Sequence, residues 1–325
     1  MTSISSVGSI SAVVVTFHTG SVLARCLDAL RLQEGIEEII LVDNGNPPGV
    51  VDAAIGPDTG APTVRRIDGH GNIGFAAACN LGARAASGDL LLFINPDAIM
   101  APGGAIALAR DGLARGGSWL LGAKVIDPDG AEQRGSRRAT LTPWRAFVEA
   151  TKLYRLAPRH PYFRRFNLHD EPCPKDVIPV PVISGACFMT PKSEYWSIGG
   201  MDERYFLHFE DVDFCLRFAK AGGAIYFDPN VSILHFKSSS EVDPIFIDMR
   251  KTSSILRYFR THFSELYPAP FMWLVTAVLW TQFGLAAFAR IAVRTFRPAR
   301  RTAADRVAIE PLHNYGATGS PTSKR

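Results

Sequence analysis

Paired cysteines are missing from this sequence. Its five cysteines, Cys26, Cys79, Cys173, Cys187 and Cys215, are odd in number, scattered, and include no Cys-x-x-Cys pair. This spacing argues against a disulfide framework and against a zinc site, and it suits a protein of the reducing cytosol. We also expect no signal peptide, because no basic region precedes the first apolar run, residues 12–15, which is far too short.

The sequence also lacks an evenly basic charge. Its formal net charge is +4, but the residues from Arg290 onward comprise eight basic and two acidic side chains. The remainder therefore carries 27 basic and 29 acidic residues, a net charge of −2. This distribution predicts no nucleic-acid-binding surface, whereas a basic end beside an apolar segment indicates contact with anionic lipid.

Short aliphatic runs alternate with segments of helical spacing in the first part of the chain. Strands are predicted at residues 9–16, 39–42, 63–67, 89–94 and 119–125, and helices at residues 21–32, 74–86 and 102–113. This alternation predicts an α/β fold with a mostly parallel sheet and with ligands at the carboxyl ends of the strands. Asp43 and Asp97 both follow predicted strands and would lie at such ends.

The next part of the chain is less regular. Residues 140–176 lose clean periodicity and gather aromatic residues among arginines, which predicts an irregular insertion over one face of the sheet. This insertion is either an acceptor site or a simple packing flap. Strand character returns at residues 177–190, 224–227 and 231–235, and a helix is predicted at residues 244–263.

One stretch, residues 271–289, contains nineteen residues without a charge and is long enough to cross a hydrocarbon core of about 30 Å. A single span would place the arginines that follow outside the cell, against the positive-inside tendency. We therefore expect a helix that lies in or dips into the cytoplasmic leaflet, and a buried core helix is the alternative.

Three carboxylates, Glu210, Asp211 and Asp213, fall within four residues among aromatic and aliphatic neighbours. Burying a carboxylate is unfavourable unless a partner compensates it. If a helix begins near Glu210, these side chains lie in its first turn, where the helix dipole favours negative charge. Arg217 follows Asp213 by four residues, which suits an ion pair along the helix. The stretch is either a self-capping helix start or a catalytic carboxylate beside a metal or substrate.

Taken together, the motifs resemble glycosyltransferase family 2, the inverting nucleotide-sugar transferases of the GT-A fold, and most closely its bacterial rhamnosyltransferase-like members. In family order over about residues 9–260 they are Val13-Val14-Val15-Thr16-Phe17-His18, Val42-Asp43-Asn44-Gly45, Gly71-Asn72-Ile73-Gly74-Phe75-Ala76-Ala77-Ala78-Cys79-Asn80, Ile94-Asn95-Pro96-Asp97-Ala98, Ser184-Gly185-Ala186-Cys187-Phe188, Gly200-Met201-Asp202-Glu203, Glu210-Asp211-Val212-Asp213-Phe214-Cys215-Leu216-Arg217 and His235. Asn95-Pro96-Asp97 stands where the family usually has Asp-x-Asp, so an amide replaces the first carboxylate.

The resemblance implies a role for each matching residue. Asp211 would be the catalytic base, with Glu210, Asp213 and Arg217 as supporting residues. Asp97 and His235 would hold Mn²⁺ or Mg²⁺, which neutralises the charge that builds on the departing nucleoside diphosphate. At position 185, glycine would let the backbone approach the donor sugar. The nucleotide-sugar donor would be bound by Thr16, Phe17, Asp43, Asn72, Asn80, Asn95 and Gly185.

The resemblance also implies an activity and a place in the cell. The protein would be an inverting, metal-dependent transferase that passes L-rhamnose from dTDP-rhamnose to a lipid-linked saccharide acceptor in cell-surface polysaccharide synthesis. It would be a peripheral or monotopic protein at the cytoplasmic face of the plasma membrane. The GT-A domain would span residues 1–265, with a nucleotide-sugar half to about residue 125 and an acceptor half beyond it. A membrane-associated segment, residues 266–302, and a disordered tail, residues 303–325, would follow.

Two other classes are weighed against this one. A non-catalytic nucleotide-sugar-binding or glycan-binding relative is disfavoured, because mere binding requires no base and Asp211 is present together with Asp43, Asp97 and His235. A nucleotidyltransferase of related fold needs a phosphate loop rich in glycine and arginine after the first strand. Residues 16–20 supply nothing comparable.

Overall fold

The computed structural model describes residues 7–296 except for positions 58–59, 61, 158–159 and 237–241. The chain divides into two compact units, Met1–Gly284 and Leu285–Arg325, and the described part of the second is the end of one long helix. The predicted tail at residues 303–325 lies outside the described residues.

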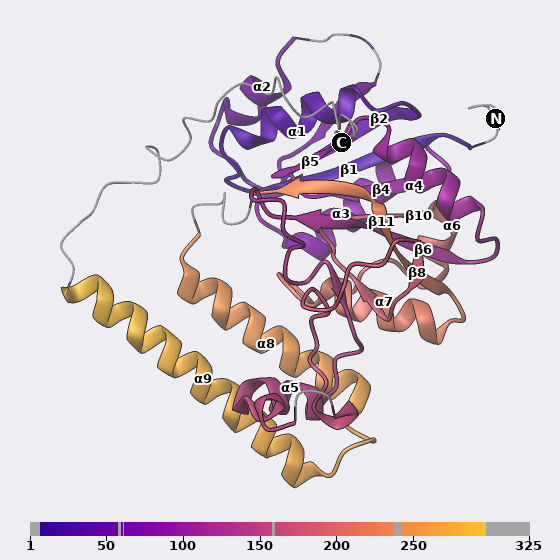
Figure 1. Ribbon diagram of the computed structural model, residues 1–325. Helices are drawn as coiled ribbons and strands as arrows, with labels where there is room; N and C mark the ends of the chain where they lie inside the picture. The colour runs from indigo at the N-terminus through magenta and orange to yellow at the C-terminus, as the bar shows by residue number, and fades with distance from the viewer. Residues whose placement is uncertain (1–6, 58–59, 61, 158–159, 237–241, 297–325) are drawn as a thin grey trace, which may run out of the picture. The chain divides into compact units, whose positions relative to one another are not determined.

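The first half of the central sheet is parallel, as the alternating strands and helices predict (Figure 1). Its strands lie in the order β3 (Thr63–Ile67), β2 (Ile36–Asp43), β1 (Ile10–Thr16) and β4 (Leu90–Ile94). Because the strands run in one direction, their carboxyl ends meet along one edge of the sheet.

The second half of the sheet is mixed. In order, β10 (Cys187–Pro191) runs antiparallel between β4 and β6 (Trp119–Ile126), β11 (Ala224–His235) is parallel to β6, and β5 (Ala98–Met100) is antiparallel to β11. The strand β8 (Ile178–Pro179) pairs with β11, and β7 (Arg137–Arg138) pairs with β9 (Val182–Ile183) in a small separate sheet. The two strands predicted at residues 224–235 are a single strand with an irregular register between Asp228 and Ser232.

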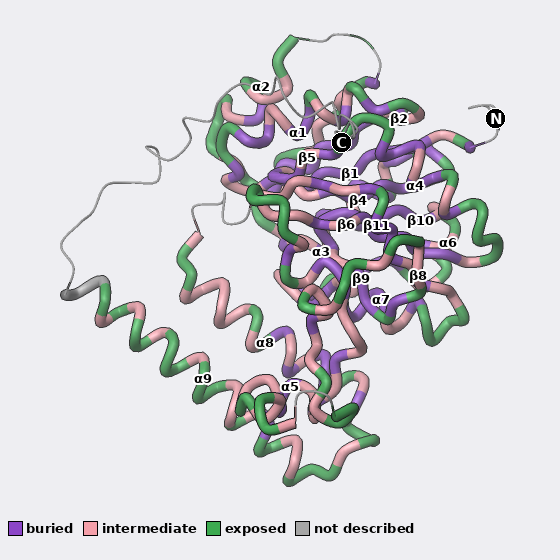
Figure 2. The backbone as a smooth tube through the Cα atoms, in the orientation of Figure 1, coloured by how far each residue is buried: buried purple, intermediate pink, exposed green. Residues whose placement is uncertain are grey.

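Helices cover both faces of the sheet. The helices of the described residues are α1 (Val22–Arg31), α2 (Val50–Ile55), α3 (Phe75–Ala85), α4 (Gly104–Leu113), α5 (Pro143–Thr151), α6 (Lys192–Ser197), α7 (Glu210–Lys220), α8 (Pro244–Phe263) and α9 (Ala269–Phe296). Alternate residues of β1 enter opposite cores: Val13 and Val15 pack with α3 and α7, whereas Ala12 and Val14 pack with α1 and α4. The central strands β1 and β4 are therefore buried along their whole length, as Figure 2 shows.

The segment at residues 140–176 is more ordered than predicted. It contains α5 and two short 3₁₀ helices, Leu153–Arg155 and Pro161–Phe163. The Thr142 side chain caps α5 by accepting a hydrogen bond from the Arg145 N–H, and Pro143 occupies the first helical position. A Thr-Pro start of this kind is a helix signal, and the mixed aromatic and basic composition concealed it.

Candidate active site

The edge of the sheet where β1 and β2 end carries the first group of predicted site residues. Thr16 and Asp43 are partners in the register of these strands. Asp43 Oδ1 accepts hydrogen bonds from the backbone of Gly45 and Asn46, and Asp43 Oδ2 lies 2.7 Å from Arg66. Burial alone would raise the pKa of Asp43, but the hydrogen bonds from Asn46 and Gly45 and the charge of Arg66 lower it. Asp43 is therefore an ordered anion at neutral pH.

Two predicted asparagines occupy different places. Asn72 lies beside the strand ends, where its Oδ1 accepts a hydrogen bond from Asn44 at 3.0 Å. Asn80 is 1% exposed, and its amide bonds to the backbone of Met201 and to the Tyr195 hydroxyl. Its side chain has no free face for a nucleotide, so the structure gives Asn80 a packing role in place of the predicted donor contact.

Asp97 and His235 lie together beyond β4 and at the end of β11. His235 Nε2 is 3.1 Å from Asp97 Oδ1 and 3.2 Å from the Asn95 amide. The other ring nitrogen, Nδ1, lies 2.7 Å from Gln133 Oε1. The amide nitrogen of Gln133 donates to Asp127 Oδ1 and to the His235 carbonyl, which turns Oε1 toward the ring. Nδ1 therefore carries a proton, which fixes the orientation of the ring, and Nε2 faces Asp97.

This pair fits a divalent cation. One carboxylate and one imidazole with a fixed tautomer suit Mn²⁺, and Mg²⁺ commonly takes only one or two protein carboxylates beside substrate phosphates. Among the described residues no cluster of three or more histidine, cysteine, aspartate or glutamate side chains could hold a metal. Diphosphate oxygens and water would have to complete the coordination of a cation held by Asp97 and His235.

The helix α7 begins at Glu210, as predicted, after two residues in the left-handed region. His208 has φ 65° and Phe209 has φ 69°. Each such residue costs about 1–3 kcal/mol unless the surroundings hold it. Packing does so here, because Phe209 is buried and the Phe75 N–H donates to the Phe206 carbonyl at 2.8 Å. A Cβ at Gly74 would lie 2.7 Å from that carbonyl, so glycine is required where the two segments meet.

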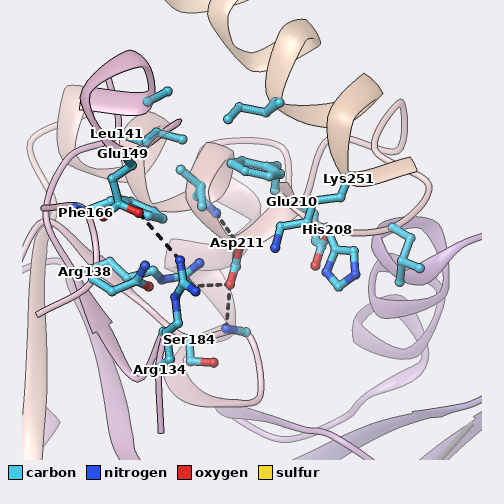
Figure 3. Close-up of a pocket in the computed structure, with 18 of the residues that line it drawn as sticks. Arg134, Arg138, Leu141, Glu149, Phe166, Ser184, His208, Glu210, Asp211 and Lys251 are labelled. Atoms are coloured by element: carbon cyan, nitrogen blue, oxygen red, sulfur yellow. Dashed lines mark hydrogen bonds and ion pairs between the residues drawn. The ribbon is translucent and has the colours of Figure 1, made fainter. Parts of the chain in front are cut away.

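Asp211 lies in the middle of a pocket, with both carboxylate oxygens bonded (Figure 3). Its Oδ2 accepts hydrogen bonds from Arg138 at 2.5 Å and from the Gly185 N–H at 2.9 Å. Burial alone would raise the pKa of Asp211, but the Arg138 charge and these hydrogen bonds lower it. A Cβ at residue 185 would lie 3.1 Å from the Asp211 Cβ, so glycine here accommodates the carboxylate as well as any donor sugar.

Glu210 differs sharply from its neighbour. Its side chain is buried, and its Oε2 has no hydrogen-bond partner among the described residues. Burial and the adjacent charge of Asp211 raise the pKa of Glu210 to about 8. At neutral pH the pair therefore consists of a charged Asp211 and a protonated Glu210.

Asp213 and Arg217 lie behind the pocket. The predicted ion pair between them is present, with Arg217 Nε 2.7 Å from Asp213 Oδ2. Asp213 Oδ1 lies 2.7 Å from His262 of α8, and Arg217 also donates to the carbonyls of Ile198 and Gly200. These contacts fix α7 against α8 and the preceding loop.

The pocket has a volume of about 630 Å³. Of the predicted residues it is lined by Asn95, Gly185, Glu210, Asp211 and His235. Thr16, Phe17, Asp43, Asn72 and Asp97 lie outside its lining, as do Asn80, Asp213 and Arg217. The pocket thus joins the Asp97–His235 pair, through His235, to the carboxylate of Asp211.

Sequence reasoning assigned no role to four side chains at the site. Gln133 fixes the His235 tautomer, Arg138 pairs with Asp211, and His208 and Lys251 line the pocket. Only Arg138 had a signal, because residues 134–138 form a basic loop in the sequence. Burial and the charge of Lys251 lower the pKa of His208 to about 4, so its imidazole is neutral at pH 7.

A mixed sheet with a metal-competent pair at the strand ends and a carboxylate across a pocket defines the class, a GT-A glycosyltransferase. GalNAc-T7 with UDP, GalNAc and Mn²⁺ has a similar fold, with a TM-score of 0.55 and 18% identity. The alignment covers 79% of this chain but only 48% of GalNAc-T7, so this chain spans about half of that protein. The mannosyltransferase PcManGT from Pyrobaculum calidifontis, in complex with GDP-Man and Mn²⁺, has a TM-score of 0.53 and 15% identity over 90% of this chain and 76% of its own.

Residues 11–170 match the family model described as glycosyl transferase family 2. The chain is also 32% identical over 254 residues to N-acetylglucosaminyl-diphospho-decaprenol L-rhamnosyltransferase of Mycobacterium tuberculosis, in the strains CDC 1551 and H37Rv. That alignment covers 70% of this chain and 76% of the relative. The chain belongs to glycosyltransferase family 2, which confirms the predicted family and the predicted transferase class.

Proposed function

We propose that this glycosyltransferase transfers L-rhamnose from dTDP-rhamnose, with inversion, to a saccharide carried on a lipid diphosphate. One observation carries the proposal: a single pocket joins His235 of the metal-competent pair to the half-buried, ionised Asp211. The printed name of the mycobacterial relative, which combines a rhamnosyl donor with a lipid-diphosphate acceptor, supports the choice of both substrates.

The chain's own residues account for the transfer as follows. Asp43, oriented by Asn46 and Arg66, accepts a hydrogen bond from the nucleotide base at the end of β2. Asp211, already deprotonated, accepts the proton of the acceptor hydroxyl as that oxygen attacks the anomeric carbon. A single in-line displacement with the base opposite the leaving group inverts the configuration. Asp97 and His235 would hold the Mn²⁺ or Mg²⁺, which supplies Lewis-acid neutralisation of the departing diphosphate.

A thermal-shift panel of nucleotide sugars, followed by transfer assays, tests the proposed donor. A ligand that binds only the folded state raises the unfolding temperature, so dTDP-rhamnose with Mn²⁺ should give the largest shift among dTDP-rhamnose, UDP-N-acetylglucosamine and GDP-mannose. A larger shift with one of the other two would remove rhamnose from the proposal. Transfer to a lipid-linked saccharide, with product configuration read by NMR, tests acceptor and inversion.

We further propose that α9 lies on the cytoplasmic face of the plasma membrane. Residues 269–293 form a helix long and apolar enough to cross a membrane, with a mean hydropathy of 1.6. One face of its first half packs on the domain through Met272, Val275 and Leu279, and Gln282 donates to the Ala150 carbonyl at 2.6 Å. Residues 283–293 then rise by about 16 Å, short of the roughly 30 Å of a hydrocarbon core. A helix lying in the interface therefore fits better than a span.

The outward side chains of α9 offer a test that preserves its packing. Trp273 is 71% exposed and Phe288 is 73% exposed. Replacing both with glutamine should reduce sedimentation with phosphatidylglycerol vesicles, because each aromatic side chain contributes to interfacial binding. Leu32→Gln, at a 76% exposed residue far from α9 in the sequence, is the matched control. Equal sedimentation of the double variant and the control would contradict the membrane assignment.

A further inference from the structure

The end of the pocket beyond Asp211 is basic. Arg134, Arg138, Lys152 and Lys251 line it, from the loop before β7, from β7 itself, from the end of α5 and from α8. His235, the pocket's link to the metal-competent pair, belongs to the strand ends of the central sheet. The pocket therefore has a second, cationic region built from different elements than its donor end.

Two of these cations are already neutralised. Arg138 is paired with Asp211, and Arg134 lies 3.6 Å from Glu149 (Figure 3). Lys251 has no ion pair or hydrogen bond with any residue in the described part of the chain. The surrounding protein and the charges of Arg134 and Arg138 lower the pKa of the Lys251 ammonium. An anion bound here would relieve that repulsion.

The same end of the pocket has an apolar wall. Ile255 of α8 and Leu279 of α9 line it, together with Phe166. Leu279 thus connects the basic region to α9, whose outward side chains Trp273 and Trp280 are exposed. A ligand that carries negative charge beside a long apolar chain matches both the cations and this wall.

We infer that Lys251, with Lys152, forms the binding site for the diphosphate of a lipid-linked acceptor, whose apolar chain leaves along α9. Phosphate oxygens accept hydrogen bonds from the lysine ammonium groups, and the saccharide beyond the diphosphate reaches Asp211. The inference rests on the proposed function for the identity of the acceptor. The alternative sources of the same phosphate chemistry are the nucleotide diphosphate of the donor and the headgroups of anionic lipids.

Calorimetric titration of the full chain in detergent with farnesyl diphosphate tests the site without requiring transfer. Lys251→Gln should weaken farnesyl diphosphate binding by about tenfold or more, as expected for the loss of a charge-assisted hydrogen bond. Lys152→Gln should also weaken it, because Lys152 is the second lysine of the same lining. Lys220→Gln, at an exposed lysine of α7 outside the pocket lining, is the matched control and should bind as the unaltered protein does.

Two further arms separate the possible sources of phosphate. Affinity for dTDP with Mn²⁺ should be unchanged in Lys251→Gln and lost in Asp97→Ala, and sedimentation with phosphatidylglycerol vesicles should be unchanged in both. The inference is overturned if Lys251→Gln binds farnesyl diphosphate as tightly as the unaltered protein does. It is also overturned if Lys251→Gln loses as much affinity for dTDP as for farnesyl diphosphate, or if it loses only its binding to vesicles. These binding results do not depend on whether the protein transfers rhamnose. A failure of the proposed transfer reaction can therefore be told apart from a failure of the proposed diphosphate site.

Discussion

The two ends of the pocket are built in different ways. At the donor end, Asn95 and His235 follow or end strands of the central sheet, and His235 is held by Gln133 and by the Asn95 amide. At the basic end, the lining side chains come from four different elements and include Arg138, Lys152, Lys251 and Leu279.

This difference separates the proposed donor end, whose side chains are already ordered by hydrogen bonds, from the proposed acceptor end, whose Lys251 makes none with the described residues. The pair of Asp97 and His235 has a fixed tautomer and needs little reorganisation to bind a cation. Lys251 instead has no hydrogen bond or ion pair among the described residues, and Asp211, the proposed base, is paired with Arg138. We expect substitutions at the donor end to change metal and nucleotide binding, and those around Asp211 to change turnover and its pH dependence.

The largest effect should come from Asp211→Asn. Because the amide cannot accept the acceptor proton, kcat should fall by about 10²–10⁴-fold, the usual contribution of a general base. Thermal shift with dTDP-rhamnose and Mn²⁺ should be nearly unchanged, since the donor end is intact. Turnover close to that of the unaltered protein would remove Asp211 as the base.

At the donor end, His235→Ala should abolish Mn²⁺-dependent binding of dTDP. Gln133→Leu should weaken Mn²⁺ affinity by about 10–100-fold, because the ring loses the partner that fixes its tautomer. Calorimetry with Mn²⁺ and dTDP measures both, and farnesyl diphosphate titration is the control for the opposite end of the pocket. Full Mn²⁺ affinity in Gln133→Leu would mean that the tautomer is fixed by other contacts.

Arg138→Gln is expected to act through Asp211. The guanidinium lowers the pKa of Asp211, so its removal raises that pKa and moves the acidic limb of kcat/KM to higher pH. A packing role alone would lower activity without moving this limb. The pH profile therefore distinguishes an electrostatic effect of Arg138 on Asp211 from a packing role. Binding of dTDP-rhamnose, which should be retained, is the control.

Glu210→Gln should have the smallest effect at neutral pH and a clear one on stability. The folded-state pKa of about 8 exceeds the ordinary value of 4.5, so between these values the native state keeps a proton that the unfolded state releases. The free energy of unfolding therefore falls as pH rises through this range. The variant should lose this slope and unfold several degrees higher than the unaltered protein at pH 8.5, where each 1 kcal/mol shifts Tm by about 2–4 °C. If the Tm of the variant and the Tm of the unaltered protein change with pH in the same way from pH 5 to 8.5, the raised pKa is contradicted.

Much of the fold was predictable because it depends on local pattern. The runs at residues 9–16, 63–67 and 89–94 are strands, and the helix predicted at residues 244–263 has those bounds as α8. The Asp213–Arg217 pair followed from helical spacing alone. The helix α5 was missed because its mixed aromatic and basic residues obscure the helical period, although Thr142 and Pro143 mark its start.

The site was only partly predictable, because its partners are distant in the sequence. Gly185 was expected to make room for a sugar, but its nearest neighbour is Asp211, twenty-six residues later in the chain. Asn80 was expected at the nucleotide, but it is bonded to Met201 and Tyr195 in the core. A sequence motif identifies residues that occur together in a family, but it does not show which of their side chains face the ligand.

The sequence by itself determined the α/β class, the order of the elements, the family and the cluster of carboxylates that contains the proposed base. These depend on apolar periodicity and on short motifs, which are local properties of the chain. Only the tertiary structure decided the charge of each carboxylate and the character of each end of the pocket. Arg138 keeps Asp211 ionised while burial keeps Glu210 protonated, and α5, α8 and α9 converge on Lys251 and Leu279. Electrostatic environment depends on what lies nearby in space, and that is set when the sheet brings distant segments together.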